Sequence, residues 1–398
     1  MRHLLAALFV LSLAVPVWAE DAKPNTLTPK EIAEGWILLF DGETNFGWRA
    51  NEKGDYIKAG KGSLLLGGHL DGHQRIFAFP IVELNNFELR FDYSVVKGND
   101  WKSFTLLFGS VFSSLTHGRT RLPIPDKDDE WQSVHFTLNN KKYTGSLYSK
   151  GKESQKWWGG TVGEHLRPVF DIKEGIQVAL RNVKLKPLAT KPLFNGKDLT
   201  GWKEFPGRKS KFSITKEGWL SVKNGNGDLQ TTGQWADFVL QLECRTNGDN
   251  LNSGVFFRCI PGEYQNGYEA QIHNGHAKKP KTYTVEEYDP KTHKVLTKKK
   301  VENWSSDFGT GSIYRRVPAR RAVAKDREWF TMTIFARGRH FATWVNGIQV
   351  ADWIDNRPDN ENPRNGCRLK KGAISLQGHD PTTDLNFRNI RIANLGAQ

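Results

Sequence analysis

Short apolar runs of strand length recur along the chain, each bounded by turn residues. Long amphipathic helical patterns are missing. Asn346-Gly347, between two such runs, is a strong signal for a tight hairpin turn. We therefore predict an all-β fold of antiparallel β-sandwiches. The clearest runs span residues 63–66, 104–108, 134–138, 219–222, 332–336 and 341–345.

A repeated sequence pattern predicts two such sandwiches in tandem. Phe40-Asp-Gly leads to Gly-Trp48, and Phe194-Asn-Gly leads to Gly-Trp202 with the same spacing. Both halves also close on an Arg-Asn pair within a strand-like segment. We predict one repeat over residues 20–187 and a second over residues 188–398, joined at a short Pro-flanked segment.

The N-terminus has the pattern of an export signal. Basic residues precede an apolar run over residues 4–15, and Ala19 ends a small-residue cleavage site. No other apolar segment approaches the length needed to span a bilayer. We predict a signal peptide over residues 1–19 and a periplasmic or secreted protein without an integral membrane segment.

The formal net charge of +14 raises the question of nucleic-acid binding. The chain has no helix-turn-helix, zinc-finger or RNA-binding pattern, and export also argues against such a partner. Basic residues gather in residues 278–321, including Lys298, Lys299 and Lys300. They either form a solvated face or contact an anionic glycan.

The three cysteines cannot form a complete disulfide framework, because their number is odd. We predict a hairpin between residues 238–244 and 254–259. It would hold Cys244 and Cys259 beyond disulfide reach. We interpret Cys244, Cys259 and Cys367 as buried residues that pack like small apolar side chains.

Alternation in two predicted strands of the second repeat places polar side chains on one face. In residues 268–273, Glu269, Gln271 and His273 share a face, opposite Tyr268, Ala270 and Ile272. In residues 374–379, Ser375, Gln377 and His379 share a face in the same way. An exposed polar face is the alternative to a functional one. We predict a cleft that gathers Arg258, Glu269, Gln271, His273, Gln377 and His379.

The two repeats are not equal. Phe108 in the first repeat stands where the second has Arg258, and the first repeat has no counterpart to residues 268–273. We therefore predict that the catalytic residues lie in the second repeat and that the first repeat is a scaffold or an accessory binding module. An insertion at residues 278–306 predicts a hairpin turning at residues 289–291, which is either a lid over the cleft or a surface decoration.

The second repeat resembles the 3-keto-disaccharide hydrolase domain family, whose members are also described as 3-keto-glucoside 1,2-lyases and 3-keto-2-hydroxy-glucal hydratases. The resemblance implies tandem concanavalin A-like (jelly-roll) sandwiches, the first degenerate, in an exported enzyme that cleaves 3-keto-glycosides. It is carried by residues 193–202, Asp237-Phe-Val-Leu, Asn252-Ser-Gly-Val with Arg258, Tyr268-Glu-Ala-Gln-Ile, Thr310-Gly-Ser-Ile-Tyr314, Ile374–His379 and Phe387-Arg-Asn-Ile.

The implied chemistry needs a base, an acid and a donor to an enolate oxygen. Glu269 or His379 is the candidate base, Arg258 with Gln271 or Gln377 the candidate donor, and His273 an acid or substrate clamp. The resemblance adds Asn252, Ser253 and Tyr314 as substrate contacts. No cofactor is predicted; a divalent metal on Glu269, His273 and His379 is the alternative. A non-catalytic carbohydrate-binding or cell-envelope protein on the same fold is the alternative function.

Overall fold

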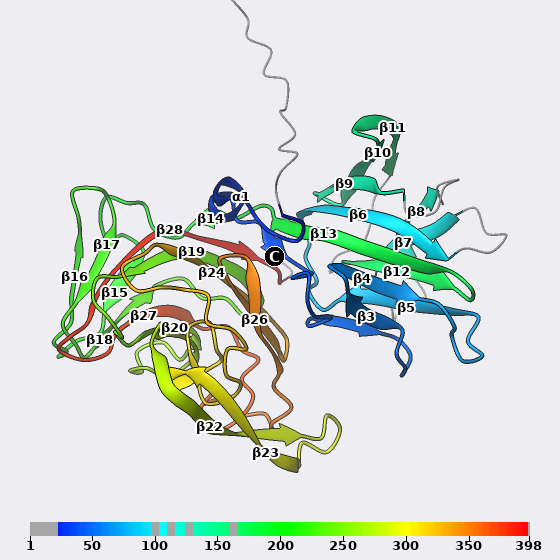
Figure 1. The fold of residues 1–398 in the computed structure, drawn as a ribbon. Coiled ribbons are helices and arrows are strands. Elements are labelled where there is room, and N and C mark those ends of the chain that lie inside the picture. Colours follow the sequence, from blue (N-terminus) through cyan, green and yellow to red (C-terminus); the bar gives the residue numbers. More distant parts are fainter. Residues whose placement is uncertain (1–22, 98–102, 110–115, 124–129, 160–165, 397–398) are drawn as a thin grey trace, which may run out of the picture.

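A computed structural model describes residues 23–97, 103–109, 116–123, 130–159 and 166–396. Within these ranges the chain forms two antiparallel β-sandwiches, preceded by the short helix α1 (Pro29–Glu34) (Figure 1). The all-β prediction is confirmed. The export-signal prediction over residues 1–19 concerns residues outside the described ranges. No described helix is long and apolar enough to cross a membrane.

The first sandwich contains strands β1 to β13 in two sheets. In the larger sheet the order is β11 (Lys152–Gly159), β10 (Lys142–Ser149), β9 (Gln132–Asn139), β6 (Phe87–Lys97), β13 (Gln177–Pro187), β4 (Ser63–Gly67) and β3 (Ile57–Gly60), with β1 (Ile37–Leu38) beside β13. In the smaller sheet it is β2 (Trp48–Ala50), β5 (Arg75–Pro80), β12 (Arg167–Lys173), β7 (Ser103–Gly109) and β8 (Thr116–Pro123).

The second sandwich contains strands β14 to β28. Its larger sheet runs β16 (Lys211–Ile214), β17 (Leu220–Lys223), β28 (Asp384–Asn394), β19 (Phe238–Thr246), β24 (Phe330–Arg337), β25 (His340–Val345) and β26 (Ile348–Ile354), with β14 (Lys191–Pro192) beside β28. Its smaller sheet, called the cleft sheet below, runs β15 (Trp202–Glu204), β18 (Gly227–Thr231), β27 (Ala373–Gly378), β20 (Ser253–Cys259) and β21 (Tyr268–Ile272).

The two sandwiches share their strand order, and the repeated sequence patterns make the same local contacts. The indole of Trp48 donates a hydrogen bond to the Leu39 carbonyl, and that of Trp202 donates to the Leu193 carbonyl. This contact closes the Gly-Trp turn against the strand before it in both sandwiches. That the first sandwich is a degenerate copy of the second stays a prediction.

The second sandwich is held together by the apolar faces of its two sheets. From the cleft sheet, Val255, Phe257, Ile374 and Leu376 point inward and are fully buried. Each such side chain contributes about 1.5–3 kcal/mol by leaving water. Because alternate residues point to opposite faces, this inward set forces the intervening residues onto the outer face of the cleft sheet.

The first sandwich packs on the outer face of the larger sheet of the second. Phe335, Ala342 and Trp344 from that sheet belong to the apolar core of the first sandwich. The Trp344 indole donates to the Leu38 carbonyl at 3.0 Å across the boundary. The cleft sheet lies on the far side of the second sandwich from this contact, so its outer face stays open.

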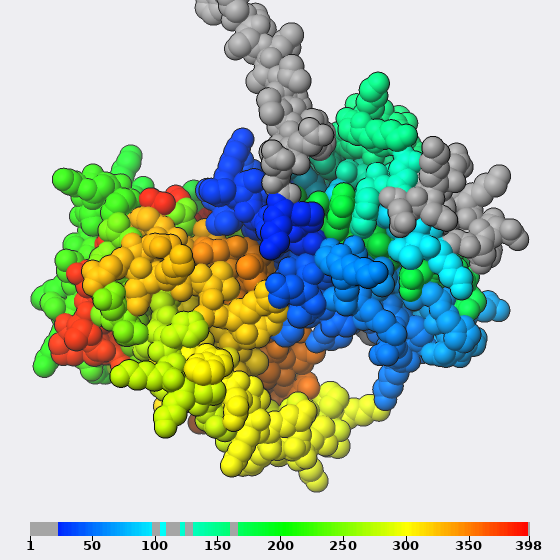
Figure 2. Space-filling model, in the orientation of Figure 1, coloured from blue at the N-terminus to red at the C-terminus, as the bar shows by residue number. Residues whose placement is uncertain are grey.

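The insertion folds as the predicted hairpin, formed by β22 (His276–Tyr288) and β23 (Val295–Ser305). It projects from the second sandwich, where Figure 2 shows it in yellow. At the hairpin turn, the imidazole of His293 contacts the Asn356 carbonyl at 2.8 Å. Lys298 and Lys299 pair with glutamates on the opposite strand, at 2.7 and 2.6 Å. The predicted contact of these lysines with an anionic glycan stays a prediction.

One local prediction is wrong. Residues 238–244 and 254–259 do not form a hairpin, because β19 and β20 lie in opposite sheets of the second sandwich. The prediction for the cysteines holds all the same. All three are buried, and all three are free thiols.

Candidate functional site

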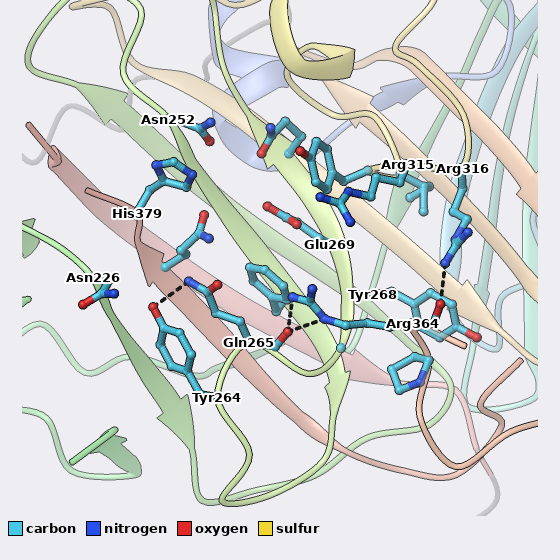
Figure 3. A pocket seen from close by; sticks show the side chains of 17 residues that line it. Asn226, Asn252, Tyr264, Gln265, Tyr268, Glu269, Arg315, Arg316, Arg364 and His379 are labelled. Atoms are coloured by element: carbon cyan, nitrogen blue, oxygen red, sulfur yellow. Dashed lines mark hydrogen bonds between the residues drawn. The ribbon is translucent and has the colours of Figure 1, made fainter. Parts of the chain in front are cut away.

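A cleft of about 330 Å³ opens on the outer face of the cleft sheet (Figure 3). Its lining comes entirely from the second sandwich. Of the residues predicted from the sequence, six line it: Asn252, Glu269, Gln271, Tyr314, Gln377 and His379. The cleft therefore brings together the polar faces of β21 and β27, with β20 between them.

Glu269 lies across the middle of the cleft floor, over a glycine on the neighbouring strand. A Cβ atom added to Gly254 would lie 2.6 Å from Glu269 Oε1, so a larger residue there would displace this carboxyl group. Burial raises the pKa of Glu269 to about 8; Arg364 and Arg315 oppose the shift, and Asp228 adds to it. At neutral pH the group is mainly a protonated acid.

His379 faces the cleft just beyond the end of β27 and is oriented by its neighbour. Its Nδ1 lies 2.8 Å from a carboxylate oxygen of Asp380. Burial alone would raise the pKa of Asp380, but hydrogen bonds from Thr382 and His379 outweigh it and hold that pKa below its usual value. An ionised Asp380 keeps the imidazole proton on Nδ1, which leaves Nε2 as an acceptor.

Two glutamines of the cleft sheet carry buried amide oxygens without a hydrogen-bond partner among the described residues. Gln271 and Gln377 are only 1% and 4% exposed. The Gln271 amide nitrogen donates to the Asp307 carbonyl at 3.1 Å, which fixes the direction of its oxygen. Both residues line the cleft, and each of these oxygens keeps an unused capacity to accept a hydrogen bond.

The segment of residues 309–317 forms one wall of the cleft, and backbone hydrogen bonds hold it to β21. Gly311 donates to the Gln271 carbonyl at 2.8 Å, and Tyr314 donates to the Glu269 carbonyl at 2.9 Å. Arg315 has a left-handed backbone with a φ of 61°. The wall that carries Tyr314 and Arg315 is therefore fixed to the strand that carries Glu269.

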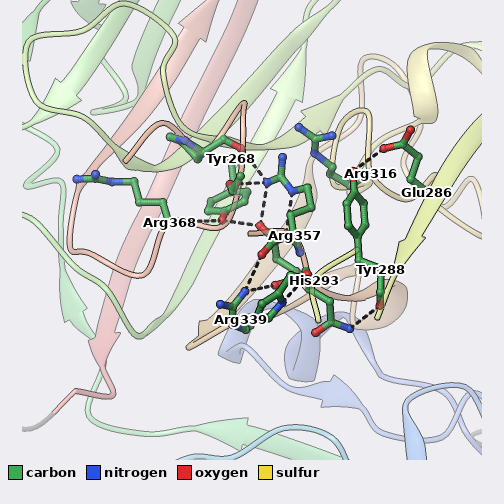
Figure 4. Close-up of polar contacts among 12 residues, drawn as sticks. Tyr268, Glu286, Tyr288, His293, Arg316, Arg339, Arg357 and Arg368 are labelled. Carbon is green, nitrogen blue, oxygen red and sulfur yellow. Dashed lines mark hydrogen bonds and ion pairs between the residues drawn. The ribbon is translucent and has the colours of Figure 1, made fainter. Parts of the chain in front are cut away.

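The adjoining part of the wall comes from residues 355–368, which wind around the side chain of Arg357 (Figure 4). Its guanidinium binds the Asp355 carboxylate at 2.8 Å and donates to the carbonyls of Pro363 and Gly366 at 2.9 and 2.7 Å. This places Arg364 at the cleft, where its Nε donates to the Gln265 carbonyl at 2.9 Å. A buried ion pair thus shapes the loop that presents an exposed arginine.

Sequence reasoning missed much of the cleft wall: Asn226, Tyr264, Gln265, Arg315, Arg316 and Arg364 also line it. These residues lie in turns and loops, where no alternation marks a face. Arg315 and Arg316 directly follow the family-like segment that ends at Tyr314, and this adjacency was the available signal. In the sequence alone, their charge is part of the general basic character of residues 278–321.

The structure does not place Arg258 in the cleft. Regular alternation along β20 would put Arg258 on the same face as Phe256, which lines the cleft. A bulge between Phe256 and Cys259, with a φ of 49° at Arg258, turns the side chain away. Its guanidinium is fully buried, pairs with Asp237 at 3.1 Å and donates to three backbone carbonyls. The prediction that Arg258 stabilises an enolate is therefore corrected: its contacts are structural.

Two other predicted residues also lie outside the cleft lining. Ser253 lies on the same face of β20 as the residues that point into the core. Its hydroxyl donates a hydrogen bond to the Gln377 carbonyl at 2.7 Å. His273 follows the end of β21, and its Nε2 lies 3.4 Å from Asp307. Burial lowers the pKa of His273, against the pull of Asp307. Neither side chain is placed to bind substrate in the cleft.

The metal alternative finds no support in the geometry of the described residues. They contain no group of three or more His, Cys, Asp or Glu side chains placed to hold a metal ion. Glu269 and His379 line the cleft, but His273, the third proposed ligand, does not.

Comparison with known proteins gives one family match. The model of the 3-keto-alpha-glucoside-1,2-lyase-like domain matches residues 189–393, which is just over half of the chain. No curated protein matches.

Several solved structures are similar to parts of the chain. Two are from Parabacteroides distasonis and are described provisionally as glycosyl hydrolases. One is 19% identical, covers 52% of this chain and 94% of its own, and has a TM-score of 0.39. The other is 25% identical, covers 52% and 98%, and has a TM-score of 0.37. A carbohydrate-binding module, CBM66 from Bacillus subtilis, is 14% identical, covers 48% and 93%, and has a TM-score of 0.30.

Proposed function

The chain belongs to the family of 3-keto-alpha-glucoside-1,2-lyase-like domains, and on that premise we propose that it cleaves 3-keto-glycosides by 1,2-elimination followed by hydration. One observation carries the proposal. The same cleft contains Glu269, an acid that is protonated at neutral pH, and His379, an imidazole oriented by a carboxylate. We also propose export, on the pattern of residues 1–19.

The reaction begins with the ketone at C3, which makes the hydrogen on C2 acidic. A base removes that proton, and the electron pair forms an enolate with C3. Collapse of the enolate breaks the bond between C1 and the glycosidic oxygen, which takes a proton from an acid. The product is a 3-keto-2-hydroxy-glucal with a double bond between C1 and C2. Water then adds, with its oxygen on C1 and a proton on C2, to give the free 3-keto sugar.

The protonation state of each side chain in the cleft decides whether it acts as the base or as the acid. Nε2 of His379 is free to accept the C2 proton, and the resulting imidazolium is stabilised by Asp380. Glu269 holds the proton that the leaving oxygen needs. Arg364, whose charge acts on Glu269, is the donor to the enolate oxygen in place of Arg258. Gln271 and Gln377 accept hydrogen bonds from substrate hydroxyl groups.

The test is incubation with a 3-keto-disaccharide while the released sugar is measured. We expect Glu269→Gln and His379→Ala to lower kcat by about a hundredfold or more, the usual range for removing a general acid or base. Glu287→Gln and His276→Ala are matched controls, because both residues are exposed on the hairpin outside the cleft, and both should retain activity. Binding of the disaccharide without turnover by the wild type would instead support the non-catalytic alternative.

Deuterated water separates elimination from direct hydrolysis. Elimination and hydration return a solvent proton to C2, so the released 3-keto sugar should carry deuterium there. Direct displacement at C1 leaves the C2 hydrogen in place. Turnover without deuterium at C2 would contradict the proposed mechanism while leaving a glycoside-cleaving function intact.

A further inference from the structure

A second cavity of about 200 Å³ adjoins the cleft, beside the β22–β23 hairpin. Its lining includes Tyr288 from the hairpin and Trp353 from β26. The two hollows share two residues, Arg315 and Arg316. A ligand with two sugar rings, one in each hollow, would therefore lie against these arginines.

Neither arginine has a carboxylate partner among the described residues. Arg316 donates to the Arg364 carbonyl at 2.8 Å, and Arg315 lies over the ring of Tyr314 at 5.3 Å. The carboxylates nearby are already engaged or uncharged. Glu286 in the second cavity binds Lys298 and the Tyr288 hydroxyl, and Asp355 binds Arg357. Glu269 in the cleft is mainly protonated at neutral pH.

The main chain that carries the two arginines is held in place by backbone hydrogen bonds. Tyr314 donates to the Glu269 carbonyl, and Arg316 donates to the Ile313 carbonyl at 2.8 Å. Two neighbouring guanidinium groups, neither in an ion pair with a described carboxylate, are matched by a carboxylate or sulfate, which accepts several N–H bonds at once. A neutral sugar would place no negative charge opposite them.

We propose that the sugar released by the reaction carries an anionic substituent, a carboxylate or a sulfate ester, which binds between Arg315 and Arg316 while its ring occupies the second cavity. The proposal depends on the proposed function, because it assigns the second cavity to the leaving sugar of a 3-keto-disaccharide. Binding of the anionic substituent by the two arginines makes the enzyme selective for acidic glycans.

The test compares three 3-keto-disaccharides of one linkage, whose leaving sugar is glucose, glucuronate or glucose 6-sulfate. We expect kcat/KM to be at least about tenfold higher for one or both charged substrates, and the two charged arms show which anion is preferred. In Arg315→Gln and Arg316→Gln the advantage should fall to within about twofold. Added salt should lower kcat/KM for the charged substrates more than for the neutral one.

Arg327→Gln is the matched control, because Arg327 is paired with Asp249 outside both hollows. It should keep the preference for charged substrates. Equal kcat/KM for all three substrates in the wild type would overturn this inference and leave the proposed function standing. If no substrate is cleaved, the proposed function fails. Calorimetric binding of the glucuronate and glucose disaccharides to the wild type and to Arg315→Gln then decides the anion preference alone. Equal affinities would overturn it.

Discussion

The raised pKa of Glu269 predicts how the stability of the protein depends on pH. The folded protein keeps this carboxyl protonated up to a pKa of about 8, whereas an exposed glutamic acid loses its proton near 4.5. Between these values folding takes up a proton, so stability falls as pH rises. A full pH unit is worth about 1.4 kcal/mol, which sets an upper limit of about 5 kcal/mol over the interval. Because the cleft is open to water, we expect about 2 kcal/mol.

The assay is urea denaturation of the wild type and of Glu269→Gln between pH 5 and pH 9. The glutamine variant cannot ionise at this position. The free energy of unfolding of the wild type should therefore fall relative to that of the variant as pH rises, and the difference should level off above about pH 8. The kcat of the wild type should decline around and above pH 8, where Glu269 in the folded protein loses its proton. A stability difference that stays constant from pH 5 to pH 9 would refute the raised pKa and the acid role built on it.

Two further substitutions test how the cleft is held. Gly254→Ala places a Cβ atom against the Glu269 carboxyl and should lower kcat about tenfold or more. Gly60→Ala, where the added atom meets nothing within 4 Å, should leave kcat unchanged; equal effects would contradict the close approach. Arg320→Gln removes a 2.6 Å ion pair with the nearly buried Asp41, which ties the end of the cleft wall to the first sandwich. It should cost about 1–3 kcal/mol in urea denaturation and raise KM more than it lowers kcat, and an unchanged KM would count against this support.

The sequence was sufficient for the features that alternation controls. Strict alternation in residues 268–272 and 374–378 predicted which side chains enter the core and which face outward, and Glu269, Gln271 and Gln377 lie in the cleft. Prediction from alternation failed where the backbone departs from regular β geometry. The bulge at Arg258 turns one predicted residue into the interior, and nothing in a single sequence marks it.

Which strands pair with one another was also beyond prediction. Residues 238–244 and 254–259 are close in sequence and strand-like, which favours a hairpin, yet they lie in opposite sheets. The position of Arg364 depends on a loop that winds around Arg357, and such a loop has no sequence period. Strand faces could therefore be assigned from local rules, whereas the arginines of the cleft wall could not.

The first sandwich shows why one strand order does not imply one activity. The strands of its smaller sheet take the same places as those of the cleft sheet. There Phe79, Leu107 and Val169 form an apolar cluster. Arg121 and Asp171 take the register positions of Gln271 and Gln377. The outer face of that sheet still carries a buried carboxyl, Asp171 on β12, which pairs with Arg75 at 3.4 Å and whose pKa is raised by burial. The contribution of the first sandwich that the structure does support is mechanical. It buries the outer face of the larger sheet of the second sandwich and anchors, through Asp41 and Arg320, the segment that leads to the cleft wall.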